Sequence, residues 1–389
     1  MVLTLLQFRQ YDTFHNLSVL TACQNGHLEM IEHIALMEVS HLSNDACLIA
    51  AVESSRLELV EYIHRLGAPL SMQLVDTAAS NGCIEILRWL IDKHGMEAEN
   101  CRAMDLAAAN EHIDALIFLN ARKFSCSTKA MDGAAQNGHL EIIKWLQMYR
   151  TEGCTVNAMN LAASNNHFDV VKWLHANRNE GCNRNAMDLA AEFGHLDMVK
   201  WLHENTNGGC TTRAVDRAAQ NNHVEVAMWL LHNRPEGCSK RVVERAVASG
   251  NVHMLNWLYK RIPIQVEFEA PLLVAAKKGH VEVLIWLYNV LGEEDELYPS
   301  HPIVEAALAG QIKVVRWYLD SGLGGCRACA HRAAVEKNYP IMAKLLEAKA
   351  AQAKPCTLCA YPVDSVDDYD DDIVVSDSDV DIDDYGDYD

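Results

Sequence analysis

The amino-acid sequence predicts an all-α solenoid of helix–turn–helix repeats that is followed by an acidic tail. Three observations lead to this fold class: a motif that returns at a nearly fixed spacing, signals for two helices in most copies, and a change of composition near the C-terminus. A fixed period of about 20–50 residues is the signature of repeat architectures. The motif is clearest in GHLEIIKWL at Gly138, and variants of it begin at Gly26, Asn166, Gly194, Asn222 and Gly279.

Each copy can be numbered from position 0, the apolar residue that follows the turn His or its equivalent. Consecutive copies are spaced 27 to 31 residues apart, and mostly 28. This spacing predicts one array of about twelve repeats over residues 14–353. The residues at position 0 are Leu28, Leu57, Ile84, Ile113, Leu140, Phe168, Leu196, Val224, Val252, Val281, Ile312 and Tyr339.

Two helices are predicted in each copy. The first follows position −13, where eight successive copies carry a residue type that caps helix N-termini. The second begins at position 0, because apolar residues at 0, +2, +3, +5 and +6 form a helical stripe. Several second helices run into EGC or GGC, whose Gly is expected to act as a left-handed C-cap. The N-cap residues are Asn44, Ser71, Asn100, Ser127, Thr155, Asn183, Thr211 and Ser239, and the C-cap glycines are Gly153, Gly181, Gly209 and Gly237.

All eight Trp of the chain occupy position +5. A ligand site would need a Trp once or twice, whereas a residue that returns in most copies indicates a role in the architecture. The indole rings are therefore expected to pack between stacked repeats. They are Trp89, Trp145, Trp173, Trp201, Trp229, Trp257, Trp286 and Trp317.

The repeat unit resembles a known family. Residues 157–174, NAMNLAASNNHFDVVKWL, are similar to the ankyrin repeat in the Ala-Ala pair, the turn His and the V-V-x-x-L spacing. The resemblance covers about residues 14–350, but the T-P-L-H start of the ankyrin repeat is replaced and the period is about 28 instead of 33. The missing residues fall where ankyrin repeats project β-hairpin fingers, so the resemblance implies shortened or absent fingers. It also implies that the His at position −1 ties adjacent loops together by hydrogen bonds.

The charge divides the chain into unequal parts. Residues 364–389 hold 13 acidic residues and no Lys or Arg, in a chain whose net charge is −20. Such a segment is expected to be a disordered tail. Residues 1–13 are expected to be a lead-in, and residues 354–363 a linker or C-terminal cap with a CxxC pair. The acidity argues against a nucleic-acid partner, whose footprint would be a basic face.

The sequence shows neither an 18-residue apolar run nor a basic, apolar leader, so neither a membrane span nor a secretory signal is expected. Thirteen Cys in such a chain predict reduced thiols and an intracellular protein, cytoplasmic or nuclear. Stacked helices lie about 8–10 Å apart, whereas a disulfide needs Cα atoms within about 4.4–6.8 Å. The loop cysteines at position −14 are therefore expected to be small buried apolar residues. They are Cys126, Cys154, Cys182, Cys210 and Cys238.

Two CxxC pairs near the C-terminus raise the question of a metal site. Cys326 and Cys329, together with Cys356 and Cys359, have the spacing of zinc ligands within each pair. The gap of 26 residues between the pairs exceeds the usual length of about 15–20, and the repeat already explains Cys326. No cofactor is therefore expected, and a structural zinc ion stays an alternative. No phosphate-binding Gly loop, nucleophile elbow or kinase motif is present, so no catalytic residue is predicted.

A solenoid acts through its extended surface. Positions −11 and −8 lie three residues apart on the first helix and share a face, so their side chains are interpreted as solvated ladders. The alternative is that the variable members contact a protein partner. Phe193 stands out because its counterparts at position −3 are mostly Asn, and an exposed aromatic residue suits a binding hot spot. The candidate contact residues are Lys129, Gln136, Glu192, Phe193, Arg213, Gln220 and Arg241.

The tail contains one apolar island, DIVVSDSDVD, at residues 372–381. Ile373, Val374 and Val375 with the acids that follow resemble a SUMO-interacting motif, which adds a strand to the sheet of its receptor. Ser376 and Ser378, each with an acid three residues on, resemble sites of acidophilic kinases. The alternative is a tail that serves solubility alone.

The sequence thus predicts a non-enzymatic scaffold for protein–protein interaction, monomeric and with neither a nucleic-acid nor a membrane partner. A substrate adaptor for the SUMO or ubiquitin machinery is the alternative, and the tail island is its only support.

Overall fold

The computed structural model describes residues 18–37, 42–97, 102–239, 241–261, 269–291, 302–323 and 325–350. Across these ranges the secondary structure is helical, and no strand occurs among the described residues. The all-α fold class is therefore confirmed, and the described loops between repeats contain no β-hairpin finger. Contacts between Cα atoms divide the chain into two compact units, residues 1–242 and residues 243–389.

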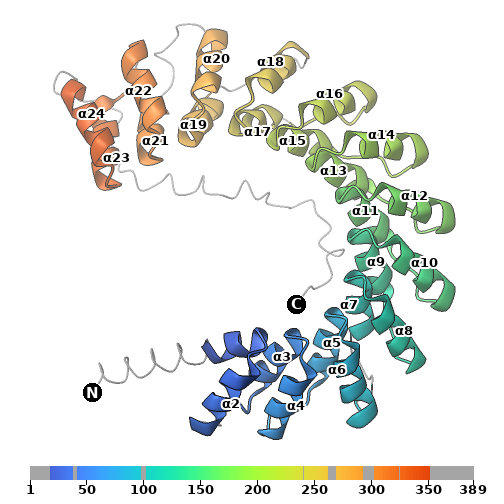
Figure 1. The fold of residues 1–389 in the computed structure, drawn as a ribbon. Coiled ribbons are helices and arrows are strands. Elements are labelled where there is room, and N and C mark those ends of the chain that lie inside the picture. The colour runs from blue at the N-terminus through green and yellow to red at the C-terminus, as the bar shows by residue number, and fades with distance from the viewer. Residues whose placement is uncertain are drawn as a thin grey trace. The chain divides into compact units, whose positions relative to one another are not determined.

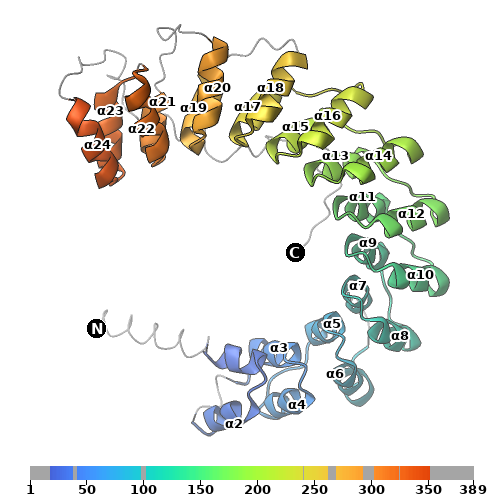
Figure 2. The same ribbon diagram turned by 45° about the horizontal axis from the view of Figure 1, so that its top comes forward.

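The helices alternate between two layers within each unit (Figures 1 and 2). The first-helix layer consists of residues 18–24 and of α3 (Asp45–Glu53), α5 (Met72–Ser80), α7 (Ala103–Ala109), α9 (Thr128–Gln136), α11 (Val156–Ser164), α13 (Arg184–Glu192), α15 (Thr212–Gln220), α17 (Val242–Ala248), α19 (Glu269–Lys278), α21 (Pro302–Leu308) and α23 (Arg327–Glu336).

The second-helix layer consists of the helices that follow each of these in the chain. They are α2 (Leu28–Met37), α4 (Leu57–Arg65), α6 (Ile84–Arg88) with the π-helical turn η2 (Trp89–Lys93), α8 (Ile113–Ala121), α10 (Leu140–Tyr149), α12 (Phe168–Asn177), α14 (Leu196–Asn205), α16 (Val224–Asn233), α18 (Val252–Arg261), α20 (Val281–Leu291), α22 (Ile312–Ser321) and α24 (Pro340–Ala350).

Position 0 is the first residue of the second helix in eleven repeats, as the sequence predicts. The assignment for the last repeat is wrong by one residue, because α24 begins at Pro340 and not at Tyr339. Tyr339 instead occupies the place of the turn His, directly after Asn338, whose φ is +59°. Its side chain lies over Gly310 of the preceding repeat, as the turn His does elsewhere. Pro suits this place because the first turn of a helix needs no donor from it.

The predicted N-caps are present at most described positions. The side chains of Asn44, Ser127, Thr155, Asn183 and Thr211 accept a hydrogen bond from a backbone N–H two or three residues on, and Ser239 accepts one from the backbone N–H of Arg241. Ser71 does not cap its helix, and its buried hydroxyl has no hydrogen-bond partner in the structure. Asn100 lies outside the described residues.

The core lies between the two layers and between neighbouring first helices. The Ala pair at positions −6 and −5 is fully buried in α11, as Ala162 and Ala163, and so are Val170 and Val171 on α12. Such small side chains allow first helices to pack closely, at the short end of the usual separation of about 8–10 Å. Each fully buried Val or Leu stabilises the fold by about 1.5–3 kcal/mol relative to its exposure.

The predicted packing of the Trp side chains is confirmed in the second-helix layer. The ring of Trp201 on α14 meets His175 of α12 edge to face, with 5.3 Å between the ring centroids. Trp229 makes the same contact with His203 at 5.2 Å. Trp201 and Trp229 therefore join their helices to the second helix before them, which is a structural role.

The role predicted for the loop glycines is wrong. Gly153, Gly181, Gly209 and Gly237 do have positive φ values, between +67° and +75°. However, α10 ends at Tyr149, and its C-cap Arg150 is extended, with φ −130° and ψ 160°. The glycine lies three residues further on, in the turn that leads into the next first helix, and the other three loops have the same design.

Candidate functional site

The side chain at position −8 forms a buried clamp between consecutive repeats. Asp188 of α13 is only 4 % exposed, and its two carboxylate oxygens accept hydrogen bonds from the backbone N–H and the hydroxyl of Thr211, at 2.8 and 2.6 Å. Thr211 in turn caps α15. Asp105 and Asp132 hold Ser127 and Thr155 in the same way. The interpretation of these residues as a solvated ladder is therefore wrong.

Among the described residues, an amide version of the clamp occurs once. Asn160 donates from its side chain to Oδ1 of Asn183 at 2.9 Å and accepts from the backbone N–H of Asn183 at 3.2 Å. Asp216 accepts from the backbone N–H of Ser239 at 3.0 Å. The sequence alone predicts surface carboxylates at position −8, because it shows a polar residue on a helix but does not show that the N-cap of the next repeat covers this residue.

Burial raises the pKa of both Asp132 and Asp188, against the hydrogen bonds from Thr155 and Thr211, which lower it. A carboxyl group whose pKa is higher in the folded state stabilises the fold most at low pH, and this contribution is lost as the pH rises through the folded pKa. We expect the stability difference between the wild type and Asp188→Asn to shrink as the pH rises from about 4 to about 7. Urea unfolding of both proteins over this range measures it. A difference that grows with pH would mean that the hydrogen bonds from Thr211 lower the pKa of Asp188 by more than burial raises it.

A second set of hydrogen bonds links the turns. The backbone carbonyl at position −4 accepts from the side chain of an Asn at position −3 in the following repeat. Asn137 donates to Ala109 at 2.8 Å, Asn165 to Gln136 at 2.7 Å, and Asn221 to Glu192 at 2.8 Å. We call this series the Asn ladder. Its purpose is structural, because it satisfies carbonyls at the C-terminal ends of the first helices.

Phe193 replaces the ladder Asn in the repeat of α13. The carbonyl of Ser164, which this Asn would serve, accepts instead from Nε2 of His195 at 2.9 Å. Phe193 is 52 % exposed and stacks on the His195 ring, with 6.4 Å between the centroids. His280 takes the place of the ladder Asn in the same way, and its Nε2 bonds the carbonyl of Ala248 at 3.0 Å. The predicted role of the turn His is thus confirmed at these two positions.

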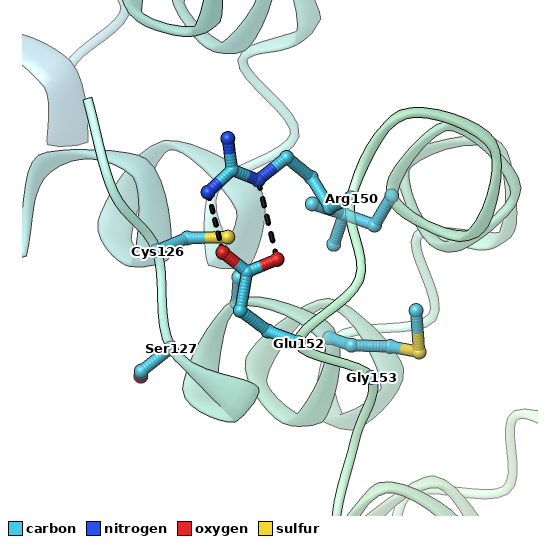
Figure 3. Close-up of a pocket in the computed structure, with 8 residues that line it drawn as sticks. Cys126, Ser127, Arg150, Glu152 and Gly153 are labelled. Atoms are coloured by element: carbon cyan, nitrogen blue, oxygen red, sulfur yellow. Dashed lines mark hydrogen bonds and ion pairs between the residues drawn. The ribbon is translucent and has the colours of Figure 1, made fainter. Parts of the chain in front are cut away.

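The loops between repeats are closed by a pair of opposite charges. Arg150 and Glu152 face each other beside Cys126 of the preceding loop, where they line a small pocket (Figure 3). Burial raises the pKa of the Cys126 thiol to about 11, so the thiol stays protonated at neutral pH. Arg178 with Glu180 and Arg234 with Glu236 repeat the arrangement. Cys154 and Cys210 are buried, and the other loop cysteines are partly buried, which fits an architectural role.

Three further positions of four consecutive first helices form what we call the first-helix face, and all of its members except the buried Ser164 are at least partly exposed. It consists of positions −11, −7 and −4 of α9, α11, α13 and α15, all in the unit 1–242. None of these side chains takes part in the clamp or the Asn ladder, although carbonyls at position −4 accept ladder bonds. Its members are Lys129, Asn157, Asn185 and Arg213 at position −11, Gly133, Leu161, Leu189 and Arg217 at position −7, and Gln136, Ser164, Glu192 and Gln220 at position −4.

Five of the seven candidate contact residues lie on this face: Lys129, Gln136, Glu192, Arg213 and Gln220. Phe193 lies at its edge, directly after α13. Arg241 precedes α17 and is exposed, outside the four helices. The sequence reasoning missed Leu161, Leu189 and Arg217. The signal that could have found them is their spacing, since position −7 lies four residues after −11 and therefore on the same side of the helix.

The proposed zinc ligands are only partly described. Cys326 caps α23, its sulfur accepting from the backbone N–H of Cys329 at 3.4 Å, while the sulfur of Cys329 accepts from Arg332 at 3.2 Å. Cys356 and Cys359 lie outside the described residues, as do the tail residues Ile373, Val374, Val375, Ser376 and Ser378. In the described part of the chain, no three His, Cys, Asp or Glu side chains converge as a metal site would require, and no helix has the length and apolarity to cross a membrane.

Comparison with protein-family models gives matches to ankyrin repeats. A model of three ankyrin-repeat copies matches residues 131–216 and again 159–243, and a second ankyrin-repeat model matches residues 75–119. A comparison with curated proteins gives no match. Ankyrin repeats are in general modules for protein–protein interaction. The paired helices, the turn hydrogen bonds and the family matches together make the chain an ankyrin-repeat protein.

Proposed function

We propose that the chain is a non-enzymatic scaffold inside the cell, which contacts a protein partner through the first-helix face and through Phe193 at its edge. The observation that carries the proposal is the replacement of the ladder Asn by Phe193. The repeat gives up a side chain with a structural bond and exposes a phenyl ring, while His195 serves the carbonyl instead. An exposed aromatic ring that the architecture does not need is the type of residue that dominates binding energy at interfaces.

The variant Phe193→Asn tests this proposal. Asn is the commonest residue at this position in the other repeats, so we expect the free energy of unfolding to change by less than about 0.5 kcal/mol. Partner capture from native lysate should fall at least about tenfold, because removal of a hot-spot residue costs 2 kcal/mol or more as an order of magnitude. Quantitative mass spectrometry of the captured proteins measures the loss.

Tyr149→Asn is the matched control. Tyr149 is also an exposed aromatic residue, 57 % accessible, but it lies on α10 in the second-helix layer, where it packs on Trp145. Its removal should leave capture unchanged. If the wild type and Phe193→Asn capture partners equally while Tyr149→Asn loses them, the contact lies on the second-helix layer and the proposal is wrong.

The adaptor role for the SUMO or ubiquitin machinery stays a prediction from the tail sequence. Capture with the full chain and with residues 1–363 tests it separately. Partners that are lost only on truncation are recruited by the tail, and partners that are retained are bound by the repeats.

A further inference from the structure

Two buried thiols meet between the first helices of the first two repeats. Cys23 lies in the helical residues 18–24 and Cys47 in α3, and their side chains are 0 % and 1 % exposed. A hydrogen bond joins the two thiol groups. The sulfur atoms are therefore in direct contact across the interface of the two helices, although the residues are 24 apart in the sequence.

The repeat register shows that packing does not require cysteine at these two places. Cys23 occupies position −5 of its repeat, and Cys47 occupies position −10 of the next one. In every interface from α5 with α7 to α13 with α15, both positions are Ala and both are buried. The thiol pair thus replaces a pair of small apolar side chains. The corresponding pairs are Ala79 with Ala103, Ala108 with Ala130, Ala135 with Ala158, Ala163 with Ala186, and Ala191 with Ala214.

The hydrogen bond makes the two thiols unequal. Together with burial, it raises the pKa of Cys23. The same bond lowers the pKa of Cys47 against the effect of burial, and a bond to the side chain of Asn44, the N-cap of α3, lowers it further. The thiolate is the form of cysteine that attacks a disulfide. Cys47 is therefore the attacking residue of the pair, and Cys23 the one that reacts second.

We propose that Cys23 and Cys47 form a reversible disulfide when a small disulfide of the glutathione type oxidises the pair. The Cys47 thiolate attacks one sulfur of glutathione disulfide, and one glutathione thiolate leaves. Cys23 then loses its proton and attacks the Cys47 sulfur of the mixed disulfide, and the second glutathione thiolate leaves. Two protein thiols are oxidised and one small disulfide is reduced, while the two protons that the cysteines release end on the two glutathione thiolates. The inference is independent of the proposed function, because neither cysteine lies on the first-helix face.

Burial controls access to the pair. The oxidant can reach the sulfur atoms only when the contact between residues 18–24 and α3 opens. The rate of oxidation therefore follows the population of this opened form, and urea below the unfolding transition should increase it. The disulfide, once formed, opposes the same opening, because it closes the chain between the two helices into a loop. The redox state thus decides how firmly residues 18–24 are held on α3.

Oxidation of the full chain tests the inference. The reduced protein is equilibrated in glutathione buffers that range from reducing to oxidising, its free thiols are blocked with N-ethylmaleimide, and mass spectrometry of proteolytic peptides identifies each bond. We expect Cys23–Cys47 to be the first disulfide to form. Cys154 is also buried, but its sulfur bonds the side chain of Arg178, so it should stay free. Hydrogen exchange of residues 18–24 should slow at least about tenfold on oxidation and stay unchanged in α15.

The double variant Cys23→Ala with Cys47→Ala is the matched control. It carries the residues that the interfaces from α5 to α15 use, so it should fold, and thermal unfolding verifies this. Oxidising buffer should leave its exchange at residues 18–24 unchanged, whereas Cys154→Ala should respond as the wild type does. Three outcomes would each overturn the inference. They are free Cys23 and Cys47 in a buffer that oxidises the urea-unfolded chain, a bond of either residue mainly to glutathione or to another cysteine, and a Cys23–Cys47 bond that leaves the exchange unchanged.

Discussion

Replacement of Asp188 by Ala is expected to lower the free energy of unfolding by about 2–4 kcal/mol. The carboxylate is buried and accepts two hydrogen bonds from Thr211, the residue that caps α15. Its removal deletes bonds to a charged acceptor and leaves a backbone N–H and a hydroxyl without their partner. Because neighbouring repeats are coupled through their interfaces, the contact between α13 and α15 should weaken first. Urea unfolding measures the total loss, and hydrogen exchange at the start of α15 localises it.

Asp188→Asn is the matched variant. The chain itself uses an amide at this position, where Asn160 holds Asn183. We therefore expect Asp188→Asn to cost less than about 1 kcal/mol, since an amide can still accept from the N–H of Thr211 and donate to its hydroxyl. Equal losses in the Ala and Asn variants would show that the charge, and not the hydrogen-bond geometry, holds the two repeats together. Unchanged stability in both would contradict the clamp.

Gly138→Ala is the second substitution with a large expected cost, about 2–4 kcal/mol. The backbone of Gly138 has a φ of +81°, a conformation that costs an L-residue about 1–2 kcal/mol. In addition, a Cβ atom at this position would lie 2.5 Å from Nδ1 of His167, in the turn of the next repeat. The imidazole would have to move away, and the contact between the turns would be lost. Thermal and urea unfolding measure the cost.

Gly181→Ala separates the two contributions. Gly181 also has a positive φ, +67°, but no atom lies within 4 Å of its would-be Cβ. Its replacement should cost only the conformational part, about 1 kcal/mol. In the double variant Gly138→Ala with His167→Ala the imidazole is absent, so the steric cost of the new Cβ atom disappears. The double variant should therefore be destabilised by less than the sum of the two single variants. If Gly138→Ala lowers the free energy of unfolding no more than Gly181→Ala does, the close approach of His167 contributes nothing to the cost.

Much of the fold could be predicted from the sequence because its signals are local. The N-cap residue, the apolar stripe and the turn lie within one repeat, and the period repeats them often enough to remove ambiguity. The prediction that the loop glycines adopt a left-handed conformation is confirmed, but the prediction that they cap the second helices is wrong. Whether α10 continues up to Gly153 or ends at Tyr149 depends on the loop that Arg150 and Glu152 close beside Cys126 of the previous repeat.

The candidate site was harder to predict, because the contacts that decide which side chains are buried and which are exposed form between repeats. By itself the sequence determined the helix pairs, the structural role of the repeated Trp and the unusual character of Phe193. Only the tertiary structure decided that Asp188 is a buried clamp and not a surface charge, and that His195 frees position 193 from the Asn ladder. Asp188 and Thr211 are 23 residues apart, and Ser164 and His195 are 31 apart. Such bonds exist only once repeats stack, because stacking is what brings a side chain of one repeat onto the helix end of another.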